Sequence, residues 1–198
     1  MKRRHNCEVS EVIAAIGPMK GGVSGGTFAS VLNILSQPWK ELQEMITLLK
    51  SPYCLEPCVL VPLPLSTERH FIGLNKEFNV FTAPWFMASV NTRCVFRSNA
   101  LLNYSYGRHF NYTEFLAFKK NLSGFFFAMI TMVMIPVMLT LLIFPPSQWL
   151  LKKCCFKPGE GPTQDQLENG CFRMRVIAKS LVGFLIYIEI CIYIYIYI

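Results

Sequence analysis

Residues 124–144 read GFFFAMITMVMIPVMLTLLIF, and this stretch constrains the fold more than any other part of the chain. It contains no charged residue, and its only polar side chains are those of Thr131 and Thr140. As a helix it would extend about 31 Å at roughly 1.5 Å per residue, which matches the hydrocarbon thickness of a bilayer. We therefore expect an apolar, membrane-associating helical segment.

Basic and aromatic residues flank this run and fit anchoring at lipid headgroups. They are Lys119, Lys120, Trp149, Lys152 and Lys153. Lysines on both sides give no orientation in the membrane, and Pro136 permits either a kinked span or a shallow re-entrant hairpin. The alternative interpretation is a buried core helix of a globular domain.

The overall composition points in the same direction. Of the 198 residues, 53% are hydrophobic and only 16% are charged, whereas globular chains carry about 25% charged residues. Such a chain has enough apolar surface to fold, which excludes an intrinsically disordered protein. The net charge of +7 suits nucleic acid or an anionic membrane, and the hydrophobic excess favours the membrane, so we expect no nucleic-acid partner.

The cysteines and the N-terminus bear on the compartment. Eight cysteines occur without a Cys-x-x-Cys pair, which favours a reduced, cytosol-facing environment over a secreted disulfide framework. The basic residues 1–5 are not followed by an apolar run, so no secretory signal is predicted.

Three segments precede the charge-free run. Apolar residues at 9–16 predict a strand that ends at Gly17-Pro18, followed by a glycine-rich turn and a helix over 28–35. A second helix is expected to begin at Pro38, with an apolar stripe at Leu42, Met45, Ile46 and Leu49. Residues 51–74 read as a proline-rich linker or loop, and residues 76–118 as strands or short helices with one wet side.

The tail alternates isoleucine with tyrosine and other residues from Ile186 to Ile198. Strict alternation is typical of a half-buried strand. We instead interpret residues 181–198 as low complexity, because a repeated AT dinucleotide in DNA translates as alternating Ile and Tyr. An uncharged β-former of this kind would be an aggregation hazard.

Two groups of residues are candidates for substrate binding. Gly25, Gly26 and Thr27 lie in a glycine cluster that matches neither a dinucleotide fingerprint nor a P-loop, so the choice is between a structural turn and anion binding at a helix start. The second group concentrates cations and amides: Asn91, Arg93, Arg97 and Asn99. Its guanidinium groups could clamp a carboxylate or phosphate, or they could tie neighbouring elements together by hydrogen bonds.

Cysteine chemistry offers two further possibilities. Cys154 and Cys155 follow the apolar run and are either lipidation candidates, as juxtamembrane cysteines, or ordinary thiols. Cys54, Cys58 and His70 are separated by a proline-rich spacer that does not impose tetrahedral geometry, so no metal site is predicted.

Several ordered blocks resemble the saccharopine-dehydrogenase-like oxidoreductases, including the trans-acting enoyl reductases. The blocks lie at 20–33 (KGGVSGGTFASVLN), 51–55 (SPYCL), 82–88 (TAPWFMA), 91–93 (NTR), 97–101 (RSNAL), 106–108 (YGR), 158–163 (PGEGPT) and 168–170 (ENG). The resemblance implies a nicotinamide-binding Rossmann domain followed by a second, α+β domain that covers substrate and mediates subunit contacts. Nothing here matches the nucleotide-binding turn, so the resemblance implies the C-terminal part of such an enzyme.

The resemblance also implies the organisation and role of the chain. Residues 8–118 would form the α+β substrate-domain fragment, 119–153 the membrane-associating segment and 154–180 a C-terminal family remnant. The fold class expected is thus α+β, a C-terminal substrate and dimerisation-type domain. This chain would bind no cofactor itself, the intact family would use NAD(P), and the reduced substrate would be lipid-linked.

The expected location is an intracellular membrane, the endoplasmic reticulum or a lipid droplet, with the bulk of the chain facing the cytosol and a homodimer possible. The fragment would be inactive alone, with a role in lipid or glycolipid metabolism. No catalytic residue can be assigned. The alternative is a non-enzymatic, membrane-anchored interaction protein.

Overall fold

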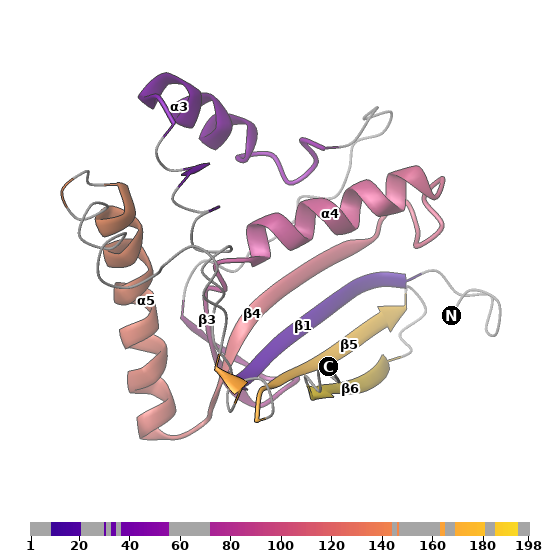
Figure 1. Ribbon diagram of the computed structural model, residues 1–198. Helices are drawn as coiled ribbons and strands as arrows, with labels where there is room; N and C mark the ends of the chain where they lie inside the picture. The colour runs from indigo at the N-terminus through magenta and orange to yellow at the C-terminus, as the bar shows by residue number, and fades with distance from the viewer. Residues whose placement is uncertain are drawn as a thin grey trace.

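The computed structural model describes residues 9–20, 30, 33–34, 37–55, 72–143, 146, 163–164, 169–180 and 185–193. Its centre is a six-stranded sheet in the order β2-β3-β4-β1-β5-β6, with helix α4 lying along it and α5 standing beside β3 and β4 (Figure 1). The strands are β1 (Val9–Lys20), β2 (Gly73–Asn75), β3 (Val80–Ala83), β4 (Asn111–Lys119), β5 (Cys171–Ser180) and β6 (Leu185–Tyr193); the helices are α3 (Trp39–Leu48), α4 (Ala88–Leu101) and α5 (Leu122–Ile143).

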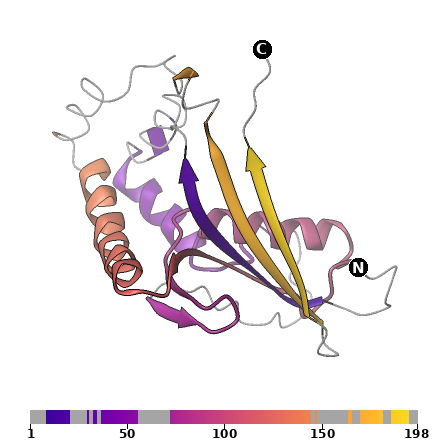
Figure 2. The ribbon, with the colours of Figure 1, turned by 90° about the horizontal axis from the view of Figure 1, so that it is seen from below.

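The sheet is mixed, which is compatible with an α+β architecture. β1 and β4 run parallel, and every other neighbouring pair in the described sheet is antiparallel. The three strands β1, β5 and β6 lie side by side as one curved surface in Figure 2. β4 and β1 are the two central strands, with two further strands on either side of the pair.

β1 continues beyond the point at which the sequence predicts its end. It runs through Gly17 and Pro18 to Lys20, while its pairing with β4 extends only to Ile16. A register shift in the pairing with β5 falls between Ile16 and Met19. Proline cannot donate a ladder hydrogen bond, and a bulge beside an open edge tolerates that loss. The strand end predicted at Gly17-Pro18 is therefore wrong, and these two residues lie at an irregularity within the strand.

The two faces of β4 carry different environments. Successive strand residues point to opposite faces, so Phe115 and Glu114 face different neighbours. Phe115 is fully buried and packs edge-to-face on Phe78, with ring centroids 5.9 Å apart, in a cluster with Ile13 and Ile177. Phe78 comes from the turn between β2 and β3, where its backbone N–H donates to Asn75 Oδ1 at 3.0 Å. That turn therefore closes one face of the sheet.

Helix α4 covers the other face of β4. Its buried residues Thr92, Arg93, Phe96 and Asn99 recur at three- and four-residue steps, which gives one buried stripe. Phe96 contacts both Tyr53 and Phe110, with ring centroids 4.6 and 6.3 Å apart. For the region 76–118 the sequence did not decide between strands and short helices. The region contains part of the β2–β3 hairpin, then helix α4 and strand β4.

Helix α3 begins directly after Pro38, as the sequence predicts. Of its expected apolar stripe, only Leu42 is fully buried, and Ile46 is 46% exposed. Of the predicted helix at 28–35, the structure describes residues 30 and 33–34, which are helical; the centre of the 51–74 linker lies outside the described residues.

A tight turn joins β4 to α5. The Asn121 side chain accepts hydrogen bonds from the Gly124 N–H at 2.7 Å and from Ser123 Oγ at 3.1 Å, which caps the first helical turn. A Cβ atom added at Gly124 would lie 1.9 Å from the Lys119 carbonyl oxygen, far inside any tolerable contact. Glycine is therefore required at this position.

The charge-free run is helical, but the expectation of a membrane-associating segment is wrong. Among the helices of the described residues, none combines the length and apolarity that crossing a membrane requires. The start of α5 is instead attached to the sheet: Ala128 is fully buried and the Phe125 ring lies 5.5 Å from that of Phe81 in β3. An absence of charge does not by itself define what surrounds a helix, so composition alone misled the prediction.

The alternating tail includes a regular strand. Residues 185–193 pair with β5 in an unbroken antiparallel register, from Lys179 opposite Leu185 to Cys171 opposite Tyr193. The alternation thus corresponds to a strand in the described part of the tail, whatever its origin in the DNA.

Candidate functional site

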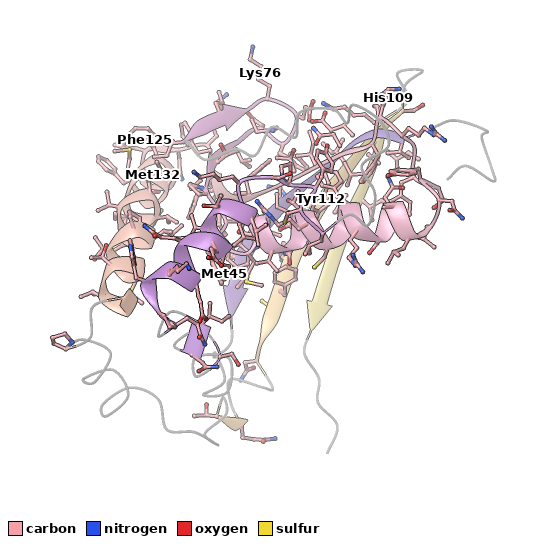
Figure 3. All side chains as sticks on the ribbon, turned by 90° about the horizontal axis from the view of Figure 1, so that it is seen from above. Met45, Lys76, His109, Tyr112, Phe125 and Met132 are labelled. Carbon is pink, nitrogen blue, oxygen red and sulfur yellow. The ribbon has the colours of Figure 1, made fainter. Side chains whose placement is uncertain are left out.

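A buried carboxylate lies between β4 and α4. Glu114 is 5% exposed. Its Oε2 accepts a hydrogen bond from Asn91 Nδ2 of α4 at 3.0 Å, and its Oε1 accepts one from the Tyr112 hydroxyl at 2.5 Å. Figure 3 places Tyr112 beside α4. We call Asn91, Tyr112 and Glu114 the β4 polar cluster.

The electrostatics of the cluster determine what Tyr112 can do. Burial, together with the hydrogen bond to Glu114 and its negative charge, raises the Tyr112 pKa far above its ordinary value. Its hydroxyl therefore stays protonated at any ordinary pH and cannot serve as a phenolate base. A carboxylate offers about four acceptor positions, and Asn91 and Tyr112 occupy two of those of Glu114.

Asn91 is the residue of the second predicted group that joins this cluster. The two arginines of that group bind main-chain carbonyls: Arg93 donates to Ser89 and Leu49, and Arg97 donates to Leu55. The bonds to Leu49 and Leu55 attach α4 to the segment that follows α3. Both guanidinium groups thus make the structural hydrogen bonds that were one of the two alternatives, and anion binding by them stays a prediction.

Asn99 organises the turn after α4. Its Nδ2 donates to the Gly107 carbonyl at 3.0 Å, and its Oδ1 accepts from the Tyr106 N–H at 3.0 Å. Gly107 has φ of 124°, a conformation that side-chain-bearing residues rarely adopt. Asn99 therefore holds the loop after α4 against the end of that helix.

The other predicted site residues cannot be placed. Gly25, Gly26 and Thr27, proposed for substrate binding, lie outside the described residues, and so do Cys154 and Cys155, proposed for lipidation. The roles suggested for these residues therefore stay predictions.

Sequence reasoning missed Tyr112 and Glu114. The available signal was alternation: in NYTEFLAFK, residues 111–119, Glu114 falls on the same strand face as Leu116 and Phe118. A charged residue in an apolar strand stripe requires a buried partner, and Asn91 is that partner. The pairing itself could not be foreseen because 23 residues separate the two positions in the chain.

A second charged group lies at the junction of β1, β5 and the β2–β3 turn. Lys179 Nζ lies 2.8 Å from Glu11 Oε2 and also pairs with Glu77. Burial lowers the Lys179 pKa, but hydrogen bonds to the two carboxylates outweigh it and raise the pKa overall. All three side chains are roughly one-third exposed, so this group holds elements together at the surface.

An open groove of about 780 Å³ runs along α3, where its described lining includes Trp39, Lys40 and Lys50. No member of the β4 polar cluster contributes to that lining. The groove and the buried carboxylate are therefore separate features.

Two curated proteins of Mycobacterium tuberculosis resemble this chain. They are named "Putative trans-acting enoyl reductase Rv2449c" (strain H37Rv) and "Putative trans-acting enoyl reductase MT2525" (strain CDC 1551). Each is 32% identical over 191 residues, which covers 89% of this chain and 44% of the relative. The chain thus spans less than half the length of these relatives. No family model and no solved structure matches the chain.

Proposed function

We propose, on the premise that this chain is homologous to enoyl-reductase-like proteins, that it forms the substrate-covering part of such an enzyme. The similarity over 89% of the chain carries this proposal. In the reaction, a hydride from NAD(P)H and a proton are added across a carbon–carbon double bond. The substrate proposed is an unsaturated acyl group carried on a lipid.

We propose that the nucleotide is bound by a part of the enzyme other than the residues described here. Dinucleotide folds use successive parallel strands and a glycine-rich turn at a helix N-terminus. The described sheet has a single parallel pair, β1 with β4, among antiparallel neighbours. Because these residues do not fit a dinucleotide pocket, we assign no step of hydride transfer to them, and we propose that the chain alone does not turn over substrate.

The β4 polar cluster supports a positioning role within this part. It is preformed, it ties α4 to a central strand, and the similarity covers nearly the whole chain around it. Its neutral tyrosine and partly filled carboxylate can hold α4 in one orientation over the sheet. A substrate-covering surface needs such rigidity, because misplacement by about 1 Å can reduce turnover by about two orders of magnitude.

A chimera tests the proposal. The matching 44% of the Rv2449c relative is replaced by this chain, and NADPH consumption is followed with a long-chain 2-enoyl thioester as the probe. We expect turnover by the chimera, with a product heavier by two hydrogens, and none by this chain alone. The intact relative provides the reference rate, and its remaining part alone is the matched control.

Two results would contradict the proposal. One is a folded chimera that leaves the thioester unchanged while the intact relative reduces it. The other is NADPH consumption by the 198-residue chain without any further part.

A further inference from the structure

The two ends of the sheet differ in how well they resist pairing with another strand. At one end, β2 has only three residues, Gly73–Asn75. At the other end, β6 has nine residues, LIYIEICIY, with no Pro, Gly or Lys. Natural edge strands are commonly protected by shortness, bulges, lysine or proline. β2 is short, whereas β6 has none of these protections and runs along β5 without a bulge.

The outer edge of β6 has main-chain groups that need partners. In the part of the chain that the structure describes, β5 is the one strand paired with β6, and the strand order ends there. Alternate N–H and C=O groups of an edge strand point away from its sheet. On the β6 surface, Ile188 is 49% exposed, so an apolar side chain accompanies these groups.

We propose that β6 pairs antiparallel with β6 of a second copy of this chain, so that two sheets join into one. The second copy is the fitting occupant because the strand is self-complementary. Residues 186, 188, 190 and 192 are all isoleucine, so a two-fold axis at any residue in the middle of the strand sets isoleucine opposite isoleucine. An isologous contact of this kind closes after one pairing.

The charge of Glu189 selects among the possible registers. An axis at Glu189 would place the two copies of this carboxylate directly opposite each other, which is destabilising. An axis at Ile188 avoids that contact and pairs the residue with its own counterpart. An axis at Ile190 would avoid that contact equally, and we place the two-fold axis at Ile188 because this residue is the exposed one, at 49%.

Charge variants of the full-length chain test this arrangement by light scattering coupled to size exclusion. The unmodified chain should show about twice its 22.7 kDa mass. Ile188→Lys and Ile188→Glu should each be monomeric, because like charges then meet at the axis. An equimolar mixture of the two variants should recover the dimer mass, which also demonstrates that both variants retain β6.

Ile46→Lys on α3 is the matched control, since Ile46 is 46% exposed and its substitution should leave the dimer intact. The proposal is overturned if the unmodified chain is monomeric, or if Ile188→Lys dimerises as the control does. It is also overturned if the mixture of variants stays monomeric. Species that grow steadily beyond a dimer would show open-ended edge pairing and overturn the closed arrangement.

Discussion

β4 and β6 are both nine-residue strands of one sheet, yet they are held in different ways. β4 pairs with β1 and β3, and each of its faces meets a specific partner: Phe78 against Phe115, and Asn91 against Glu114. Among the described strands β6 pairs with β5 alone, and every even-numbered residue of β6 is isoleucine. Shifting β4 along its neighbours would break named contacts, whereas a two-residue shift of β6 replaces isoleucine by isoleucine.

The difference shows that the length and β-propensity of a strand do not determine how strongly its register is fixed. Register is fixed where individual side chains have individual partners, and it is weakly specified in repetitive strands. For this molecule, the α4–β4 region is the defined scaffold on which a substrate-covering function would depend. β6 is an adaptable edge.

The strongest test of the β4 side is Gly124→Ala. The new Cβ would meet the Lys119 carbonyl at 1.9 Å, so the β4–α5 turn must open. We expect a loss of about 3 kcal/mol or more in the free energy of unfolding, measured by urea denaturation. Gly73→Ala in β2 is the control, because its Cβ would meet nothing closer than Thr82 Oγ1 at 3.4 Å. Equal effects of the two substitutions would contradict the account of the turn.

Removing the buried carboxylate should have the next largest effect. Glu114→Leu leaves Asn91 Nδ2 and the Tyr112 hydroxyl without their acceptor, which should cost about 2 kcal/mol. Glu114→Gln retains an acceptor oxygen and should cost less. Glu44→Leu, at an exposed position of α3, is the control and should change the stability little. If Glu114→Leu were neutral in thermal and urea unfolding, the cluster would not be what holds α4 on β4.

The raised pKa of Tyr112 predicts a pH dependence at the alkaline end. Above about pH 10 the tyrosine ionises in the unfolded chain but stays neutral in the folded one, so folding stability falls as the pH rises. The contribution is one proton, or about 1.4 kcal/mol per pH unit. Unfolding measured from pH 8 to 11 should fall less steeply for Tyr112→Phe than for the unmodified chain. Identical slopes would mean that Tyr112 ionises equally in both states.

The smallest effect is expected at the partly exposed ion pairs between β1, β5 and the β2–β3 turn. Lys179→Met removes the contacts with Glu11 and Glu77 but keeps most of the apolar stem. Exposed pairs contribute about 0.2–1 kcal/mol, so we expect a loss within that range, reduced further at high salt. A loss above about 2 kcal/mol would show that the β5 side is fixed by charge and would weaken the contrast with β4.

Local signals in the sequence predicted several elements but not their contacts. The strand beginning at residue 9 and the helix after Pro38 follow from residue periodicity and proline chemistry. The run 124–144 gives a helix, but periodicity cannot tell which of its residues dock on Phe81.

The candidate site was harder to foresee. Asn91 was identified by its residue type, while Tyr112 and Glu114 were missed because a polar residue in a strand gains meaning only from a partner distant in sequence. For Arg93 and Arg97, residue type left anion binding and structural hydrogen bonds both open, and the fold directs both side chains to main-chain carbonyls. Contacts between residues that are distant in the chain therefore determine the site. A single sequence does not show which residues make these contacts.

Amide hydrogen exchange at low protein concentration tests the contrast between β4 and β6 most directly. We predict that the central amides of Asn111–Lys119 exchange only through global unfolding, because both edges of β4 are bonded. Amides of Leu185–Tyr193 should exchange faster, through local opening at a lower free energy. Protection of β6 equal to that of β4 in the monomer would contradict the account.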